Sequence, residues 1–317
     1  MAQPLIEATN VTKSFGEVKA LNGVNVSVPE GSIHGLLGHN GAGKTTLVHI
    51  LSTLLQPTSG TARICGFDVA KNGQDVRRAI GLTGQFASVD EQLSGRDNLN
   101  LIARLLGASS RQARTRSDEL LELFDLTAAA TRPISQYSGG MRRRLDISAS
   151  LVGSPRVIFL DEPTTGLDPT SRLGVWEIVE RLANDGVSVL LTTQYLEEAD
   201  RLCEEITLLS KGSVIARGTP AELKADVGQR MVTVTLASEA DLPLAVKALE
   251  HAGAQPNTQE SGAVISVPVA VSSDLAVIVR ALNEAHTEIA ELGFSEPTLD
   301  DVYLRLTHEP GGQPVPA

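Results

Sequence analysis

The feature that most constrains this chain is a glycine-rich segment, GHNGAGKT, which fits the pattern G-x-x-x-x-G-K-[ST]. An apolar run at residues 32–37 precedes it and predicts a buried strand, and the apolar run at residues 45–55 predicts a helix. A glycine loop between a strand and a helix turns backbone N–H groups inward, where they can surround phosphate oxygens. A chance match within an ordinary turn is the alternative, but the flanking strand and helix favour a phosphate-binding loop.

Two side chains of this loop have distinct predicted roles. Lys44 supplies a positive charge to the β- and γ-phosphates of a nucleotide, and the hydroxyl of Thr45 suits Mg²⁺. The positive end of the following helix also points at the phosphates. The residues of this segment expected to contact a nucleotide are Gly38, His39, Asn40, Gly41, Ala42, Gly43, Lys44, Thr45 and Thr46.

A second feature is the apolar strand VIFLDEP at residues 157–163, in which Asp161 and Glu162 follow the apolar residues. Such a strand delivers its last side chains to the carboxyl edge of a parallel sheet, beside the phosphate loop. Asp161 is therefore expected to hold Mg²⁺ through a water molecule, and Glu162 to polarise an attacking water molecule. Two solvated carboxylates at a strand end are the alternative, which the presence of Lys44 disfavours.

A third feature is the motif Ser138-Gly139-Gly140-Met141 at the predicted start of a helix. A serine followed by two glycines exposes a hydroxyl and backbone N–H donors, a second arrangement that suits phosphate. An ordinary helix cap is the alternative for so short a motif. Its place in the chain, between the phosphate loop and Asp161, favours the phosphate-binding interpretation.

Strands alternate with helical patterns up to about residue 225, which predicts an α/β fold with a largely parallel sheet and helices on both faces. After residue 225 the order becomes strand, helix, strand, helix, strand, which predicts a small α+β domain. The charge balance changes there too, since residues 226–317 hold 13 acidic and 4 basic side chains. We therefore expect one domain over residues 1–225, a second over 226–308 and a disordered tail over 309–317.

The last predicted helix begins near residue 299. Thr298 and Asp301 are expected to form a capping box at its start. Its apolar stripe is predicted to consist of Leu299, Val302, Tyr303 and Leu306.

Composition excludes several classes of function. The net charge of −11 and the pI near 5.1 argue against binding nucleic acid or anionic lipid through bulk charge. Cys65 and Cys203 form no pattern typical of a zinc site or a disulfide framework, so the reducing cytoplasm is the simplest location. No apolar run approaches the ~18–20 residues that cross a bilayer, and no secretory signal is expected. A membrane role would therefore need another subunit.

Taken in order, these motifs resemble those of the nucleotide-binding subunit of an ABC transporter, over roughly residues 5–220. The resemblance implies a P-loop NTPase of the ABC ATPase type that hydrolyses ATP with Mg²⁺, with a helical subdomain inserted at about residues 86–150. It assigns Lys44 and Thr45 to the Walker A loop, and Ser138–Met141 to the signature motif. Asp161 becomes the Walker B aspartate and Glu162 the catalytic glutamate.

Further positions acquire roles from the resemblance alone. Gln85 matches the glutamine that touches Mg²⁺ and senses the membrane partner, and Asp168 matches the D-loop aspartate. Phe15 occupies the aromatic position that stacks on adenine, with a ring packed on the core as the alternative. Gln194 stands where the family usually has a histidine that contacts the γ-phosphate. Its neutral amide can still donate a hydrogen bond to phosphate but cannot become an imidazolium.

Several stretches narrow the resemblance to the ATPases of daunorubicin/doxorubicin-resistance exporters, namely TGQFASVDE, YSGGMRRRLDIS, TTQYLEEAD and TLDDVYLRLT. This group implies that a drug, polyketide or lipid-like cargo moves through a separate permease of the ABC-2 exporter type. It also implies that two copies of the chain pair head to tail, with each ATP between Lys44 of one copy and Ser138–Gly140 of the other. The expected location is the cytoplasmic face of the cell membrane, with no nucleic-acid partner.

Other classes of protein fit the sequence less well. A non-transport ABC ATPase usually carries a long inserted coiled coil or two ATPase halves, and neither pattern is present. Two alternatives stay open at this point, an ABC import subunit with a regulatory C-terminal domain and a module that binds ATP as a structural ligand. The presence of Glu162 disfavours the second. The basic run Arg142–Arg144 is expected to be a solvated helix face with ion pairs, with phosphate binding across the dimer as the alternative.

Overall fold

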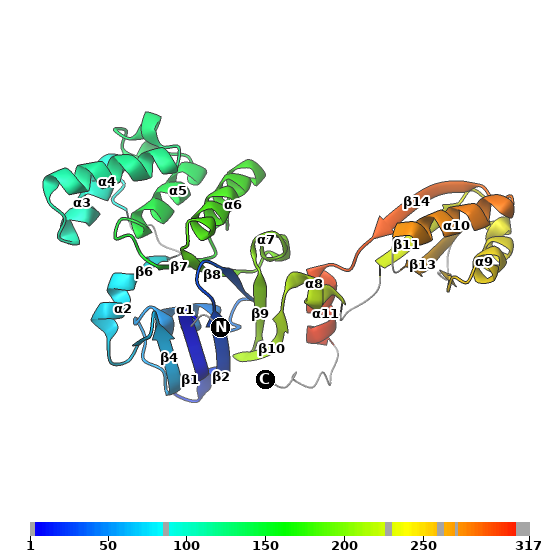
Figure 1. Ribbon diagram of the computed structural model, residues 1–317, viewed down its shortest axis with the longest axis horizontal. Helices are drawn as coiled ribbons and strands as arrows, with labels where there is room; N and C mark the ends of the chain where they lie inside the picture. The colour runs from blue at the N-terminus through cyan, green and yellow to red at the C-terminus, as the bar shows by residue number, and fades with distance from the viewer. Residues whose placement is uncertain (1–3, 85–88, 226–229, 259–262, 270–271, 309–317) are drawn as a thin grey trace. The chain divides into compact units, whose positions relative to one another are not determined.

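Figure 1 shows the computed structural model, which describes residues 4–84, 89–225, 230–258, 263–269 and 272–308. The chain divides into two compact units, and the boundary falls between Pro220 and Ala221. The phosphate loop, the VIFLDEP strand and the Ser138 motif all belong to the first unit. The predicted tail at residues 309–317 lies outside the described residues.

The first unit begins with an antiparallel sheet in the strand order β2–β1–β4–β5. Its strands are β1 (Ile6–Phe15), β2 (Val18–Val28), β4 (Ser59–Ile64) and β5 (Phe67–Asp68). Ile6 pairs with both Val28 and Ile64, so these three buried side chains lie side by side on one face of the sheet. Their common burial places that face against the core, as the alternation of apolar and polar residues in an antiparallel sheet indicates.

The second sheet is mainly parallel, in the order β10–β9–β3–β8–β7–β6. Its strands are β3 (Ile33–Leu37), β6 (Ile80–Thr83), β7 (Val157–Asp161), β8 (Ser188–Thr193), β9 (Glu205–Ser210) and β10 (Ser213–Gly218). The strands β9 and β10 pair antiparallel, and the other neighbours pair parallel. Every residue of β3, β7 and β8 is buried, which is typical of parallel strands covered on both faces.

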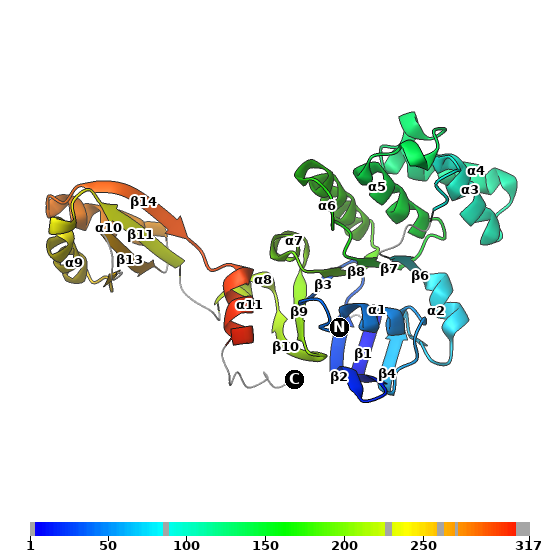
Figure 2. The same ribbon diagram turned by 180° about the vertical axis from the view of Figure 1, so that it is seen from behind.

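The two faces of the parallel sheet have different covers. Figures 1 and 2 show α5 (Gly139–Ser150), α6 (Pro169–Asn184) and α7 (Leu196–Leu202) on one side, and α1 (Lys44–Leu51) with the antiparallel sheet on the other. On the second side Leu47 of α1 clusters with Val11 of β1 and Phe159 of β7 in one core. The predicted α/β architecture is confirmed. One face, however, is covered by a helix together with a sheet, where helices alone were expected.

A helical segment connects β6 to β7. Its helices are α3 (Gly95–Leu105), α4 (Ser110–Leu123) and α5, with the 3₁₀ turns η1 (Thr127–Ala129) and η2 (Ile134–Gln136), while α2 (Gly73–Ala79) precedes β6. A serine hydroxyl caps α3, α4 and α5 by accepting a backbone N–H of the first turn, and the three capping residues are Ser94, Ser109 and Ser138. The sequence positions of these caps explain where each helix begins.

The second unit begins within α8 (Pro220–Ala225), whose first residue precedes the boundary. Its elements are β11 (Arg230–Leu236), η3 (Glu239–Asp241), α9 (Leu242–His251), β12 (Asn257–Thr258), β13 (Val264–Val269), α10 (Ser272–Glu284) and β14 (Ile289–Ser295). They form an antiparallel sheet in the order β12–β13–β11–β14, whose buried side chains, such as Val232 and Val234, pack with Leu249 and Leu282 of the two helices. The predicted order lacked β12, because two residues are too few to display an alternating pattern.

The last helix, α11 (Leu299–His308), has the predicted capping box. The backbone N–H of Thr298 donates to Oδ2 of Asp301 at 2.9 Å, and the N–H of Asp301 donates back to Oγ1 of Thr298 at 3.2 Å. Leu299 and Val302 are buried, as the predicted stripe requires. Among the described residues, no helix combines the length and the apolar character needed to cross a membrane.

Candidate functional site

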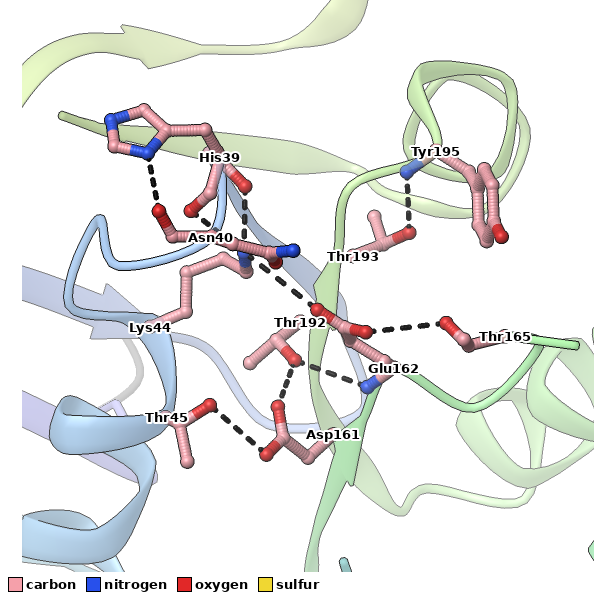
Figure 3. A network of polar contacts seen from close by, with 11 residues as sticks. His39, Asn40, Lys44, Thr45, Asp161, Glu162, Thr165, Thr192, Thr193 and Tyr195 are labelled. Atoms are coloured by element: carbon pink, nitrogen blue, oxygen red, sulfur yellow. Dashed lines mark hydrogen bonds and ion pairs between the residues drawn. The ribbon is translucent and has the colours of Figure 1, made fainter. Parts of the chain in front are cut away.

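The glycine-rich segment forms the turn between β3 and α1 (Figure 3). Gly43 immediately precedes α1 and has a φ of 109°, in the left-handed region. A Cβ atom at Gly43 would lie 2.7 Å from the carbonyl oxygen of Ala20, so glycine alone fits there. The turn borders a pocket of about 300 Å³, lined by Ala20, Asn40, Gly41, Ala42, Gly43, Lys44, Thr45, Thr46 and Glu162.

Lys44 places its ammonium group in the wall of this pocket, where the residue is only 4% exposed. Its Nζ donates to the carbonyl oxygens of Gly38 at 2.6 Å and His39 at 3.2 Å. It also lies 3.9 Å from Oε1 of Glu162. Burial lowers the pKa of Lys44, while the carboxylates of Glu162 and Asp161 oppose that shift. A phosphate oxygen that enters the pocket can therefore replace neutral carbonyl groups as the partner of a poorly solvated cation.

Asp161 is the last residue of β7 and is buried. Its Oδ2 accepts a hydrogen bond from Oγ1 of Thr45 at 3.2 Å, and its Oδ1 accepts one from the hydroxyl of Thr192. Thr192 pairs directly with Asp161 across the parallel strands β7 and β8. Thr192 is not among the site residues predicted from the sequence, where the only signal for it is a predicted strand that ends in two threonines.

Glu162 follows Asp161 in a left-handed conformation with a φ of 48°. This conformation costs a residue with a Cβ about 1–2 kcal/mol, so the surrounding contacts must hold it. Its backbone N–H donates to the carbonyl oxygen of Thr192 at 3.0 Å and to Oγ1 of Thr192 at 3.1 Å. Its Oε2 accepts from the hydroxyl of Thr165 at 3.2 Å (Figure 3). The side chain, 11% exposed, is thus held at the pocket, opposite Lys44.

Oxygen atoms of Thr45, which lines the pocket, and of the neighbouring Asp161 suit Mg²⁺. The hydroxyl of Thr45 lies 3.2 Å from the carboxylate of Asp161, and Glu162 follows directly in the chain. Hydroxyl and carboxylate oxygens are the ligands that this ion prefers, and no soft sulfur or imidazole ligand lines the pocket among the described residues. Gln85, the third predicted metal ligand, lies outside the described residues.

The Ser138 motif opens α5 and does not line this pocket. Ser138 and Gly139 are exposed, and the Ser138 hydroxyl accepts the N–H of Met141 at 3.2 Å, so the motif does cap its helix. Gly140 lies in close contact with Ser171 of α6, which leaves no room for a Cβ atom there. The Ser138 motif therefore contributes no residue to the pocket beside the phosphate loop of the same chain.

Three other predicted residues are exposed and outside the pocket lining. Asp168 caps α6, where hydrogen bonds from the hydroxyl of Ser171 at 2.6 Å and its N–H at 2.9 Å lower the pKa of Asp168. Gln194 directly follows β8. Phe15 ends β1 with 49% of its surface exposed and with Nζ of Lys13 5.1 Å from its ring centre, so it is not packed in the core.

The three arginines Arg142–Arg144 differ from one another, and the expectation of a solvated face with ion pairs is wrong for one of them. Arg142 and Arg144 pair with carboxylates of the helical segment. Arg143 instead turns inward and donates to backbone carbonyl oxygens next to Glu162. No side-chain pattern distinguishes it from its neighbours, because its partners belong to the backbone.

Comparison with known proteins identifies relatives along nearly the whole chain. Two family models match, ABC transporter at residues 21–165 and ATP-binding protein DrrA1-3-like, C-terminal domain, at residues 218–307. The chain is 49% identical to the daunorubicin resistance ATP-binding protein DrrA2 of Streptomyces coeruleorubidus, over 95% of this chain and 94% of that protein. It is 36% identical to the Nod factor export ATP-binding protein I of Ralstonia nicotianae, over 96% of this chain and 94% of that protein.

Solved structures agree with these relatives. A dimeric ATP-binding cassette bound to ADP and phosphate, in a post-hydrolysis state, matches with a TM-score of 0.61 and 28% identity. The match covers 68% of this chain and 98% of that chain. The chain therefore belongs to the ABC transporter family, as an ATP-binding subunit of the group that includes the daunorubicin-resistance proteins.

Proposed function

We propose that this chain hydrolyses ATP and thereby energises export of a drug, polyketide or lipid-like compound through a separate membrane permease. One observation carries the proposal: Nζ of Lys44 lies 3.9 Å from Oε1 of Glu162 in one pocket, with Asp161 the preceding residue. A cation for phosphate, a carboxylate for water and a carboxylate for a metal ion are the parts that phosphoryl transfer to water needs.

The phosphate loop binds the triphosphate. Backbone N–H groups of the loop that ends at Gly43 surround the phosphate oxygens, and Lys44 exchanges its bonds to Gly38 and His39 for bonds to the β- and γ-phosphates. Because the ammonium group is almost fully buried, its attraction to phosphate is stronger than it would be in water. The γ-phosphate is thereby held next to Glu162.

Glu162 acts on the attacking water. Its carboxylate accepts a hydrogen bond from that water, which turns the oxygen lone pair toward the γ-phosphorus and favours loss of the proton. The hydroxyl of Thr165 and the backbone contacts to Thr192 keep the carboxylate in place. Gln194, exposed just beyond β8, donates its amide N–H to a γ-phosphate oxygen where other members of the family use histidine.

Thr45 and Asp161 would hold Mg²⁺, and we assign Gln85, which lies outside the described residues, to the same ion. When bound, the ion neutralises charge that develops on the phosphate oxygens. The chain contributes by fixing the ligands in advance. Thr192 donates to the Asp161 carboxylate, and Thr45 lies in the first turn of α1.

A second copy of the chain completes each site. Ser138 and Gly139 are exposed at the start of α5, where their hydroxyl and N–H groups, with Gly140 and Met141, can reach the γ-phosphate held by the partner copy. A phosphate bound by both copies stabilises the closed pair, and hydrolysis removes that bridge. Asp168 lies in the loop that faces the partner copy. Phe15 stacks on adenine, a contact of about 1–3 kcal/mol.

The cargo and the permease are proposed by analogy. The printed names of the relatives refer to drug resistance and to export, which favours an exporter over an importer. We assign this chain to the cytoplasmic face of the cell membrane, held there by a permease of the ABC-2 exporter type. In this proposal residues 1–225 form the ATPase domain, and residues 226–308 form an accessory or regulatory domain.

The test is ATP hydrolysis by the wild type and by Glu162→Gln, with each protein also sized in ATP. We expect hydrolysis to fall by at least about 100-fold in Glu162→Gln, the size of effect that a positioned general base contributes. An ATP-stabilised dimer should accumulate, because the γ-phosphate that joins the two copies is no longer hydrolysed. Glu177→Gln, an equal change at an exposed position on α6, is the matched control and should behave like the wild type. A wild type that binds ATP with Mg²⁺ but never hydrolyses it, alone or with its permease, would contradict the proposal.

A further inference from the structure

Arg143 joins the signature helix α5 to the carboxyl ends of two strands of the parallel sheet. Its guanidinium donates to three backbone carbonyl oxygens, through Nε to Pro163 at 2.6 Å, Nη2 to Asp161 at 3.1 Å and Nη1 to Gly84 at 3.3 Å. Gly84 follows β6, and Asp161 ends β7. One side chain therefore connects α5 to both neighbouring strands.

Two of these carbonyl groups flank Glu162, since they belong to the residue before it and the residue after it. Glu162 has a φ of 48°, a left-handed conformation that costs a residue with a Cβ atom about 1–2 kcal/mol. Thr192 holds the Glu162 N–H from one side, and Arg143 holds the adjoining carbonyls from the other. Thr192 and Arg143 therefore contact the backbone on both sides of the Glu162 side chain.

The electrostatic surroundings of Arg143 also favour a fixed position. Burial lowers the pKa of the guanidinium, and the carboxylates of Asp146, Asp161 and Glu198 oppose that shift. Glu198 is fully buried, and its Oε1 accepts from the hydroxyl of Thr164, the residue after Pro163, at 2.8 Å. A planar fork with five N–H donors suits several carbonyl acceptors at once, whereas an ammonium group cannot match that arrangement.

The flanking arginines make different contacts. Arg142 donates to Glu91 at 2.9 Å and to the carbonyl of Ser135 at 3.2 Å, both within the helical segment. The contacts of Arg144, to the carbonyl of Phe124 and the carboxylate of Asp125, also stay within that segment. Among these three arginines, only Arg143 bonds to the carbonyl groups on both sides of Glu162.

We propose that Arg143 is a positioning residue that holds the backbone around Glu162 and makes hydrolysis depend on the placement of the signature helix. The inference rests on the proposed function, because it assumes that Glu162 acts on water. In the closed pair, ATP held by the second copy contacts the start of α5. Any shift of that helix then moves the Arg143 guanidinium. The carbonyl groups on both sides of Glu162 then move with it, and the carboxylate approaches or leaves the γ-phosphate.

The first experiment measures kcat, KM and binding of a fluorescent ATP analogue for Arg143→Met, with Arg142→Met as the matched control. We expect kcat of Arg143→Met to fall by about 10–100-fold, because misplacing a reacting group by about 1 Å has an effect of that size. Nucleotide binding and KM should stay within about twofold of wild type, since the phosphate loop is untouched. Arg142→Met should retain wild-type kcat. A wild-type kcat in Arg143→Met overturns the inference.

Arg143→Lys decides the question if the methionine variant does not fold. Lysine keeps the positive charge but lacks the planar group of N–H donors. We therefore expect Arg143→Lys to have a kcat between that of the wild type and that of an inactive variant, with unchanged ATP binding. Full activity of Arg143→Lys would mean that charge alone suffices and that the three carbonyl contacts do not position Glu162.

The second experiment separates positioning from phosphate binding across the dimer. We expect the double variant Arg143→Met/Glu162→Gln to form the same ATP-stabilised dimer as Glu162→Gln, because Arg143 acts on the chemical step. Loss of that dimer in the double variant overturns the inference and assigns Arg143 to the ATP interface. Absence of hydrolysis in the wild type, with no dimer in Glu162→Gln, would instead reject the proposed function itself.

Discussion

Replacing Thr192 with valine removes one hydroxyl from a fully buried position and preserves the shape of the side chain. That hydroxyl donates to Oδ1 of Asp161 and accepts the backbone N–H of Glu162. The N–H keeps a second acceptor, the carbonyl of Thr192 at 3.0 Å, so the main loss is the bond to the Asp161 carboxylate. A hydrogen bond to a charged group contributes about 1.5–3 kcal/mol, so we expect the free energy of unfolding to fall by about 2 kcal/mol.

The same bond fixes the orientation of Asp161, and loss of such an outer contact typically lowers metal affinity or activity by about 10–100-fold. Thr192→Val should therefore need more Mg²⁺ for half-maximal ATP hydrolysis and should lose at least about tenfold in kcat. The matched control is Thr207→Val, since Thr207 is fully buried in the same sheet but bonds to His34 at 2.9 Å. Denaturant titrations should give a lower free energy of unfolding for both variants. The Mg²⁺ dependence of hydrolysis should change in Thr192→Val alone. Equal Mg²⁺ titrations for the wild type and Thr192→Val would refute the reasoning.

Three further predictions concern separate features. Lys44→Met should abolish phosphate release, because Lys44 is the one cationic side chain among the described residues that line the pocket; retained activity would show that another group neutralises the γ-phosphate. Gln194→Ala should lower hydrolysis and Gln194→His should keep it, whereas unchanged turnover in the alanine variant would mean that Gln194 does not touch the γ-phosphate. Glu205 has a pKa lowered to about 2 by the ring of His34 and by the guanidinium of Arg217. Nδ1 of His34 lies 3.6 Å from Oε2 of Glu205. Because the folded state lowers this pKa, the stability that it provides is complete well above the ordinary pKa of 4.5 and is lost as the pH falls toward 2. Glu205→Gln should thus reduce the free energy of unfolding by about 1 kcal/mol at pH 7, after allowance for solvent screening, and by less at pH 3. Denaturant titrations that give an equal reduction at both pH values would contradict this assignment.

The sequence predicts well those parts of the site whose functional residues are consecutive in the chain. The phosphate loop lies between an apolar strand and a helix, and the VIFLDEP strand carries both carboxylates at its end. Because buried parallel strands are continuous apolar runs, both strands can be recognised from the sequence alone. Their meeting point then follows from strand order: β3 and β7 both pair with β8, so Lys44 and Glu162 come together at one edge.

The parts that the sequence does not predict depend on contacts between distant segments. Thr192 has its role because β8 pairs in register with β7, and a local pattern does not contain that register. Arg143 binds carbonyl oxygens, which every residue possesses, so its inward orientation has no sequence signature. The pairing of β1 with β4 likewise needs partners that alternation alone cannot specify.

The connection between β6 and β7 determines where this chain tolerates a change of length. These strands are parallel neighbours, so the chain that leaves Thr83 must return along the full length of a strand before it enters at Val157. For the five-residue β7 that distance is about 17 Å, which a short loop cannot bridge. Deleting the helical segment and joining its ends would therefore unravel the edge of the sheet. Lengthening it at the exposed Gly107, between α3 and α4, would leave the sheet intact, so insertions and deletions here have opposite outcomes.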